Sequence, residues 1–162
     1  MHADEDSCAL NGIAHVYLTV RDFDACLPFY EKLLEFFDMK CLVKTDALFY
    51  CVGSRTGVGI RRASAENRDT PFDPYRAGLH HLCFRARSRE DVDRVHDFAT
   101  EIGARIVHPP CEDDWAPGYY SVLFEDPGGI RLEVNFVPGK GNLDSDVELP
   151  LPADVQRRLS QS

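Results

Sequence analysis

An internal repeat constrains the fold of this 162-residue chain more than any single segment does. Each half opens with Gly-x-x-His, at positions 12–15 and 78–81, and then follows the order strand, helix, strand, strand, strand. The expected strands lie at 13–20, 41–44, 48–52 and 58–62 in the first half, and at 78–86, 105–107, 119–124 and 130–136 in the second. Two similar units in tandem predict an α+β fold built from two βαβββ modules.

The two expected helices carry their own start and stop signals. Asp22 precedes the first helical stripe, and Ser88 opens Ser-Arg-Glu-Asp, a capping box for the second helix. Pro28 falls in the first turns, where proline disrupts a helix least, and Gly103 is well placed to end the second helix. The apolar residues expected to face the core are Phe23, Leu27, Phe29, Tyr30, Leu33, Leu34 and Phe37, and then Val92, Val95, Phe98, Ala99 and Ile102.

The segments outside these patterns divide the chain. We expect a polar N-terminal tail at 1–11, a first module at 12–63, a connecting loop with two prolines at 64–77, a second module at 78–137 and a C-terminal tail at 138–162. A short helix is expected near 155–159. The two modules together should form one domain, and the C-terminal tail is assigned no chemistry.

The charge balance argues against a partner with a negatively charged surface. Lys and Arg number 18 against 27 Asp and Glu, which gives a net charge of −9, and the basic residues form no cluster. We therefore expect neither nucleic acid nor a membrane as a partner. The polar, acidic beginning of the chain does not resemble a secretory signal, which predicts a cytoplasmic protein. The six scattered cysteines are expected to be reduced and buried.

Strand alternation directs polar side chains from three strands to one side of the sheet. In the first strand, one face is uniformly apolar and should meet the helix. His81 matches His15 by position and parity, whereas His80 falls on the helix side. The residues expected on the face away from the helices are Ile13, His15, Tyr17 and Thr19, then Leu79, His81, Cys83 and Arg85, and finally Arg131, Glu133 and Asn135.

The repeat and two of its segments closely resemble the vicinal oxygen chelate superfamily, which includes glyoxalases, bleomycin-resistance proteins, fosfomycin-resistance transferases and extradiol dioxygenases. The segments are Phe-Tyr-Glu-Lys-Leu-Leu at 29–34 and Tyr-Tyr-Ser-Val-Leu-Phe-Glu-Asp-Pro-Gly-Gly-Ile-Arg-Leu-Glu-Val at 119–134. The resemblance, over roughly 12–137, implies a U-shaped eight-strand sheet around a concave metal site. At the ligand positions of that family, this chain has His15, His81 and Glu133.

The chain departs from lactoylglutathione lyases at a fourth ligand position. The last strand of its first module, Gly-Val-Gly-Ile-Arg-Arg, contains no acid, and Arg61 or Gly59 occupies that place. The second proton-accepting glutamate of the lyase mechanism is also missing. Two His and one carboxylate leave coordination positions open, which is similar to ring-cleaving dioxygenases and fosfomycin transferases. Tyr17 stands where those transferases have Thr, which disfavours the transferase of that type.

These residues predict a divalent-metal enzyme, with Fe, Mn, Zn, Ni or Co, that acts on a small molecule chelating the metal through adjacent oxygens. Iron would suit a dioxygenase, and the other ions a lyase, an isomerase or a transferase. Dimerisation is common in this superfamily, and we expect a homodimer. The candidate metal ligands are His15, His81 and Glu133, the candidate catalytic residues are Glu133, Tyr119 and Tyr17, and the candidate substrate-binding residues are Arg85, Ser121, Asn135 and Trp115.

Other interpretations of the same residues stay open. Glu133 could pair with Arg131, Arg85 or Arg61 in a salt-bridged network that needs no metal. The chain could be a non-catalytic small-molecule-binding protein of the bleomycin-resistance kind, although those proteins typically lack the metal residues. It could also be an interaction domain with a vestigial site. The loop at 108–118, with Trp115, could cover the site or be a solvated connection.

Overall fold

The computed structural model describes residues 8, 10 and 12–139 of the chain. Most of the two expected tails, including the short helix near 155–159, lies outside the described residues. The chain divides into two compact units, Met1–Pro71 and Phe72–Ser162, which are described one at a time. None of the helices in the described part has the length and apolar character needed to cross a membrane.

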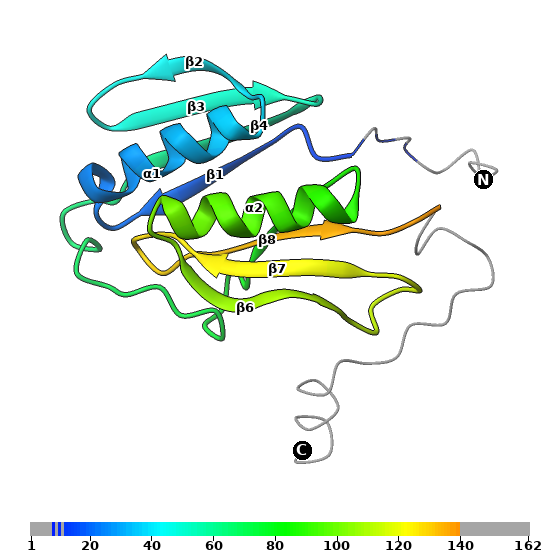
Figure 1. Ribbon diagram of the computed structural model, residues 1–162. Helices are drawn as coiled ribbons and strands as arrows, with labels where there is room; N and C mark the ends of the chain where they lie inside the picture. The colour runs from blue at the N-terminus through cyan, green and yellow to red at the C-terminus, as the bar shows by residue number, and fades with distance from the viewer. Residues whose placement is uncertain (1–7, 9, 11, 140–162) are drawn as a thin grey trace. The chain divides into compact units, whose positions relative to one another are not determined.

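The first unit is a four-stranded sheet with one helix (Figure 1). Its strands lie side by side in the order β1-β4-β3-β2, with β1 parallel to β4 and the other neighbours antiparallel. The edge strand β2 therefore has one hydrogen-bonded neighbour. The elements are β1 (His15–Val20), α1 (Phe23–Phe36), β2 (Lys40–Lys44), β3 (Leu48–Gly53) and β4 (Thr56–Arg62).

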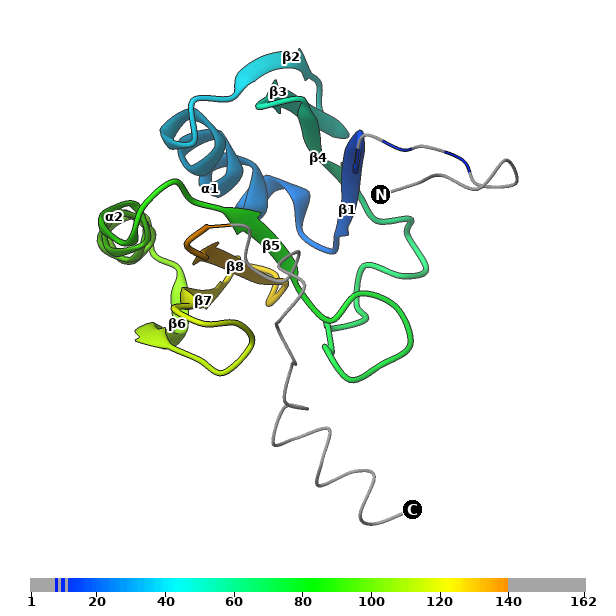
Figure 2. The same ribbon diagram turned by 90° about the vertical axis from the view of Figure 1, so that its right-hand side faces the viewer.

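The core of the first unit lies between α1 and one face of this sheet (Figure 2). Leu18 and Val20 are 3% and 1% exposed, whereas Tyr17 is 44% exposed, so the predicted alternation of β1 is confirmed. The side chain of Asp22 accepts a hydrogen bond from the Ala25 N–H at 3.0 Å, which confirms the predicted helix start. The core residues of this unit are Leu18, Val20, Phe23, Cys26, Phe29, Tyr30, Leu33, Leu34, Phe49, Cys51, Val58 and Ile60.

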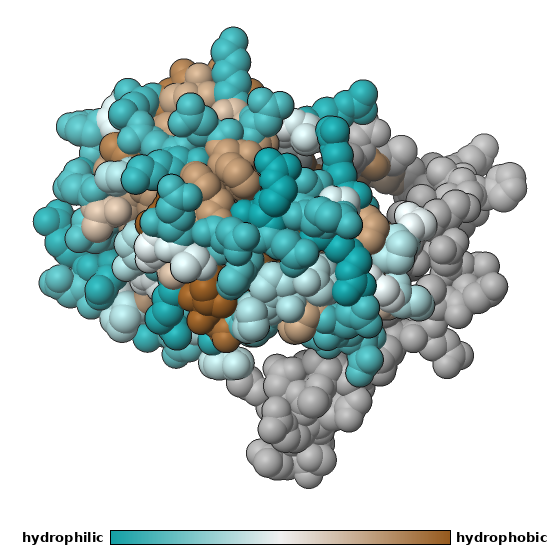
Figure 3. All heavy atoms as spheres, in the orientation of Figure 1, coloured by the Kyte–Doolittle hydropathy of each residue, from teal (hydrophilic) through white to brown (hydrophobic). Residues whose placement is uncertain are grey.

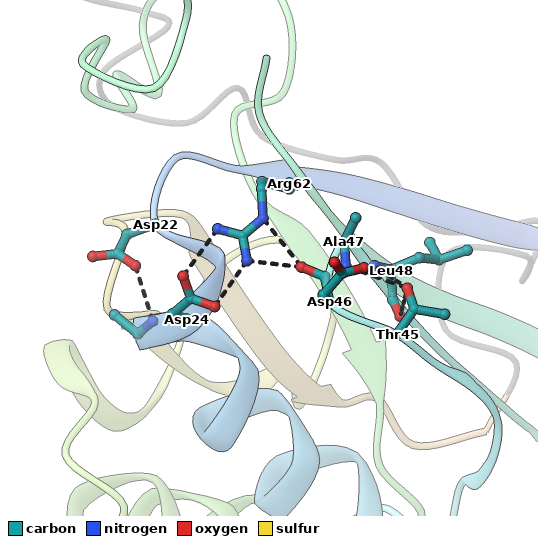
Figure 4. Close-up of polar contacts among 8 residues, drawn as sticks. Asp22, Asp24, Thr45, Asp46, Ala47, Leu48 and Arg62 are labelled. Atoms are coloured by element: carbon teal, nitrogen blue, oxygen red, sulfur yellow. Dashed lines mark hydrogen bonds and ion pairs between the residues drawn. The ribbon is translucent and has the colours of Figure 1, made fainter. Parts of the chain in front are cut away.

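Arg62, the last residue of β4, ties the start of α1 to the turn between β2 and β3 (Figure 4). Its guanidinium donates to both carboxylate oxygens of Asp24, at 2.9 and 2.8 Å, and to the carbonyl of Asp46 at 2.7 Å. The same guanidinium lies over the ring of Phe23, 5.0 Å from its centroid. This pairing joins three segments that are distant in sequence.

The second unit repeats the same architecture around a second helix. Its strand order, β5-β8-β7-β6, again has one parallel pair, β5 with β8, and two antiparallel pairs. Tandem βαβββ modules of the α+β class are thus confirmed, while their joining into one U-shaped sheet stays a prediction. The elements are β5 (Leu82–Arg85), α2 (Arg89–Glu101), β6 (Arg105–Glu112), β7 (Tyr120–Glu125) and β8 (Arg131–Phe136).

Local backbone signals match between the units. Gly12 and Gly78, which open the two modules, both have positive φ angles, of 107° and 135°. The Ser88 hydroxyl caps α2 by accepting from the Asp91 N–H at 3.1 Å, as predicted. Gly103, at φ 88°, follows the end of α2, which confirms its predicted role as a stop.

Most of the strands differ from the prediction by one or two residues at an end, and two differ by more. The strand expected at 78–86 begins only at Leu82, because Gly78 has a left-handed backbone and residues 79–81 do not join the ladder with β8. His80 is consequently exposed rather than on the helix side. The strand expected at 105–107 continues to Glu112 through Pro109 and Pro110. An edge strand tolerates proline because one side of it needs no ladder partner, and register shifts accompany this stretch.

The core of the second unit lies between α2 and β6, β7 and β8. Its apolar members are Val92, Val95, Ala99, Val122, Phe124, Ile130, Leu132 and Val134.

The prediction that the cysteines are buried is wrong for four of the six. Only Cys26 and Cys51 are buried, and all six are free thiols. Hydrophilic side chains cover most of the molecular face in Figure 3, with small apolar areas between them.

Candidate functional site

Glu133 is a buried carboxylate on the sheet face opposite α2. It alternates along β8 with Leu132 and Val134, which pack in the core, and it is itself only 8% exposed. The strand register places it between Cys83 of β5 and Leu123 of β7. A buried carboxylate is costly unless hydrogen bonds and charges compensate for the lost water, so its partners define the site.

Three side chains hydrogen-bond to Glu133. The Tyr119 hydroxyl donates to Oε1 at 2.6 Å, and Nε2 of His81 lies 3.0 Å from Oε2. Burial alone would raise the pKa of Glu133, but the hydrogen bonds from His81, Tyr119 and Ser121 outweigh it and the pKa is lowered. The arrangement therefore holds an ionised carboxylate inside the protein.

Tyr119 keeps its proton in this arrangement. Burial comes first among the causes that raise the pKa of its hydroxyl, and the hydrogen bond to Glu133 and the charge of that carboxylate add to it. The hydroxyl is a donor while protonated, which is the state that the short contact with Glu133 requires. Tyr119 lies directly before β7, where its own N–H bonds to the carbonyl of Ala116 at 3.0 Å.

The other ring nitrogen of His81 meets a second histidine. Nδ1 of His80 and Nδ1 of His81 are 2.7 Å apart, so a proton on one of them must be shared as a hydrogen bond to the other. If His81 donates from Nε2 to Glu133, its neutral form accepts at Nδ1 from His80. His80 is thus a residue of the site that strand alternation had assigned to the helix side. Neighbouring histidines at a strand start were the only signal for it.

The predicted substrate-binding residues of β5, β7 and β8 form one row. Arg85 and Ser121 both stand opposite Asn135, on the two sides of β8. This row is two residues beyond Glu133 along the strand, on the same face. Ser121 is buried, and Arg85 is exposed at the end of β5. Trp115 lies in the turn after β6, 39% exposed, and its proposed role as a cover stays a prediction.

Among the residues that the structure describes, the ion pair of Glu133 is with His81 and no arginine pairs with it. Arg131 pairs with Glu125 instead, at 3.5 Å, and Arg105 pairs with the same carboxylate. The ion-pair partner of Glu133 is His81, beside its hydrogen bond from Tyr119. Glu125 on β7, which was not predicted for the site, is thus the carboxylate that pairs with arginines.

In the first unit, His15 and Tyr17 lie on the face of β1 away from α1. The Tyr17 ring meets His15 edge-on, with centroids 5.6 Å apart, and stacks on Tyr50 at 5.3 Å and 17°. Tyr50 was not predicted for the site, although its parity with Leu48 and Val52 on β3 could have indicated it. The two rings form a flat aromatic surface, the Tyr17–Tyr50 pair.

Two glycines of β4 make room for the Tyr17–Tyr50 pair. A Cβ at Gly59 would lie 2.6 Å from Cε1 of Tyr17, and a Cβ at Gly57 would lie 2.0 Å from the Tyr50 hydroxyl. Gly59 stands opposite Tyr17, two residues after His15, just as Glu133 stands opposite Cys83, two residues after His81. Gly59 rather than Arg61 is therefore the counterpart of Glu133.

The donor types at Glu133 fit a divalent ion. An imidazole nitrogen and an ionised carboxylate meet at 3.0 Å, and Tyr119 orients the second carboxylate oxygen, as outer partners of metal ligands commonly do. Within the part of the chain that the structure describes, no group of three or more His, Cys, Asp or Glu side chains that could hold a metal is present. The trio of His15, His81 and Glu133 stays a prediction.

Comparison with known proteins gives concordant results. The family model described as Glyoxalase/Bleomycin resistance protein/Dioxygenase superfamily matches residues 12–134. The uncharacterized protein YqjT of Bacillus subtilis is 29% identical over 124 residues, which cover 74% of this chain and 94% of that protein. The Virulence protein STM3117 of Salmonella typhimurium is 25% identical, over 83% of this chain and 90% of its own length.

A solved structure shares the architecture as well. The glyoxylase/bleomycin resistance protein/dioxygenase domain from Frankia sp. EAN1pec superposes with a TM-score of 0.63 and 29% identity. The match covers 79% of this chain and 98% of the Frankia chain.

Proposed function

Because the chain belongs to the Glyoxalase/Bleomycin resistance protein/Dioxygenase superfamily, we propose that it is a divalent-metal enzyme that acts on a small molecule bearing two adjacent oxygens. The observation that carries the proposal is the buried Glu133 carboxylate, kept ionised beside Nε2 of His81. A protein gains little stability from such a pair compared with apolar packing. Ionisable groups with shifted pKa values gather at functional sites, which favours a chemical role.

In this proposal, His81 and Glu133 are two metal ligands and His15 is the third. His15 enters on its position in β1 of the first unit, which matches that of His81 in the second. A divalent ion held by these groups would polarise the adjacent oxygens of the substrate, or with iron would support oxygen chemistry. Any of Fe, Mn, Zn, Ni or Co suits two imidazoles and one carboxylate.

The remaining residues would bind and orient the substrate. Tyr119 fixes one oxygen of Glu133 and holds a proton at its hydroxyl. The row of Arg85, Asn135 and Ser121 offers a cation, an amide and a hydroxyl beside Glu133. Tyr17 offers an exposed aromatic face to a flat part of the substrate.

Metal analysis tests the ligand assignment. Wild-type protein should hold about one ion per chain after reconstitution, and His81→Ala, His15→Ala and Glu133→Gln should each lose most of it. His96→Ala is the matched control, because His96 lies on α2 beside Asp97, away from Glu133. Equal metal content in wild type and His81→Ala would remove the metal from the proposal.

Oxygen consumption tests the reaction branch. Iron-loaded protein is given catechols in an oxygen electrode, with the Glu133→Gln variant beside it. Uptake that depends on Glu133 supports a dioxygenase. Absence of uptake in fully loaded protein leaves the lyase, isomerase and transferase branches, which are then assayed with the other divalent ions.

One observation favours a second function, non-catalytic binding of a small molecule. Where the second unit has Glu133, the first has Gly59, which lies under the Tyr17 ring. The stacked Tyr17–Tyr50 pair is a surface for stacking and offers no carboxylate to a metal. Tight binding of an aromatic probe by metal-free protein, with no turnover in any metal form, would favour this function.

Light scattering tests the homodimer that we also propose.

A further inference from the structure

Two cysteines face each other across the antiparallel strands β2 and β3. Cys41 stands directly opposite Cys51 in the register, and both are free thiols. Residues opposite each other in a ladder point to the same side of the sheet, so both thiols lie on the face that α1 covers. Cys51 is buried there, at 2% exposure, whereas Cys41 is exposed because β2 is the edge strand.

The backbone spacing of this pair suits a covalent bond. Opposite residues of an antiparallel ladder have Cα atoms about 4.5 or 5.5 Å apart, depending on the kind of pair. Both spacings lie within the range of about 4.4–6.8 Å that a disulfide spans. The pair itself is in direct register, and the register shift of β2 begins only after Cys41, so the sulfurs can meet through a local adjustment of the edge strand.

The two thiols also interact electrostatically. Burial raises the pKa of Cys51 to about 12, and the neighbouring Cys41 contributes to the same shift. Cys51 therefore stays protonated at neutral pH and is hidden from solvent. A soluble oxidant meets Cys41 first.

We infer that Cys41 and Cys51 form an oxidation site at which hydrogen peroxide produces a disulfide between β2 and β3. The Cys41 sulfur attacks the peroxide, the O–O bond breaks, and Cys41 becomes a sulfenic acid while one water leaves. The Cys51 sulfur then attacks the sulfenic sulfur, the S–O bond breaks, and the departing hydroxide takes the Cys51 proton as a second water. Two thiols are oxidised by two electrons, and one peroxide is reduced to two waters.

The remaining strand cysteines provide an internal comparison. Among the described residues, Cys83 stands opposite Glu133 and Cys111 opposite Ser121, so neither has a cysteine as its ladder partner. The exposed Cys111 should therefore be oxidised without forming an intramolecular disulfide. The inference concerns the first unit alone and does not depend on the proposed metal site.

Peptide mapping tests the disulfide in the full-length protein. Reduced protein is treated with hydrogen peroxide, free thiols are blocked with N-ethylmaleimide, and the protein is digested with trypsin without reduction. Trypsin cuts after Lys40, Lys44 and Arg55, so the two cysteines fall in separate peptides, 41–44 and 45–55. We expect these peptides to be joined, with a mass two hydrogens below their sum, and to separate after reduction.

Two variants complete the test. Cys111→Ser should still form the linked peptide. Cys41→Ser should not form it, and its Cys51 should be recovered either alkylated by N-ethylmaleimide or as the free thiol. Cys41 is exposed, so its replacement by Ser should not impair folding. Recovery of peptides 41–44 and 45–55 unlinked from peroxide-treated wild type, with Cys41 at the sulfinic stage, would overturn the inference. A linked peptide that joins Cys41 to Cys111 instead would also overturn it.

Discussion

The two units share one strand order, but they differ in the side chains that their strands present on the sheet face away from the helix. Each unit has a row of three residues on the sheet face away from its helix, at corresponding register positions. The row is Tyr17, Gly59 and Tyr50 in the first unit, and Cys83, Glu133 and Leu123 in the second. In the first, the Tyr17 ring lies over Gly59 and stacks on the Tyr50 ring, which lies over the neighbouring Gly57. In the second, a carboxylate occupies that space and binds a tyrosine and a histidine.

A repeated backbone thus carries two different sets of side chains at matching positions. The strand order and the helix caps depend on backbone and core residues, which the two units share in kind. The units differ in the row, where the middle strand carries a glycine in the first unit and a carboxylate in the second. The close approach of the Tyr17 ring needs a glycine at 59, because a Cβ there would lie 2.6 Å from Cε1 of that ring.

The largest expected effect comes from neutralising Glu133, the acid in the row of Cys83, Glu133 and Leu123 in the second unit. Glu133→Gln keeps the shape but removes the negative charge, so the affinity for a divalent ion should fall by at least about 100-fold. Titration calorimetry with Mn²⁺ or Zn²⁺ measures the affinity of each protein for the ion. The matched control is Glu112→Gln, since Glu112 pairs with Arg89 on the surface. Unchanged affinity in Glu133→Gln would mean that Glu133 does not bind the ion.

The next largest effect comes from adding a side chain at Gly59, in the row of Tyr17, Gly59 and Tyr50 in the first unit. Gly59→Ala places a Cβ 2.6 Å from the Tyr17 ring, and the free energy of unfolding should fall by about 1–3 kcal/mol because the rings must move. Urea unfolding measures it. Combining Gly59→Ala with Tyr17→Ala should cost less than the sum of the two single changes, because the clash is absent. Strict additivity would show that the ring does not constrain Gly59.

A pH-dependent effect should appear in the second row alone. The pKa of Glu133 is lowered from its ordinary 4.5 in the folded protein, so its ionisation stabilises the fold above that pH. This contribution is lost as the pH falls through the lower folded pKa. The stability difference between wild type and Glu133→Gln should therefore shrink as urea unfolding is repeated from about pH 5.5 down to about pH 3.5. A constant difference would mean that the carboxylate titrates as it does in the unfolded chain.

The smallest expected effect concerns the helix ends. After α2 the left-handed position is Gly103, at φ 88°, but after α1 it is Asp38, at φ 56°. Asp38→Gly should raise the free energy of unfolding by about 0.5–1 kcal/mol, because glycine adopts this conformation without steric cost. Thermal unfolding measures it, and Asp38→Ala should lower the stability instead. A stabilising Asp38→Ala would contradict the argument.

Much of the architecture followed from local patterns. The alternation of β1, the Asp22 and Ser88 caps and the stop at Gly103 were predictable because each depends on residues close together in the chain. The boundaries of β5 and β6 were not. They depend on which backbone groups find a partner in a neighbouring strand, and that partner lies far away in sequence.

The candidate site divides in the same way. By itself, the sequence determined the repeat, the faces of the strands and the candidacy of His81, Glu133 and Tyr119, because these follow from periodicity and from a resemblance carried by motifs. Only the tertiary structure decided that Gly59 rather than Arg61 matches Glu133, that Tyr50 stacks on Tyr17, and that Cys41 faces Cys51. The physical reason is register. Which residues stand opposite each other is set when strands pair across the sheet, and alternation within one strand carries no information about it.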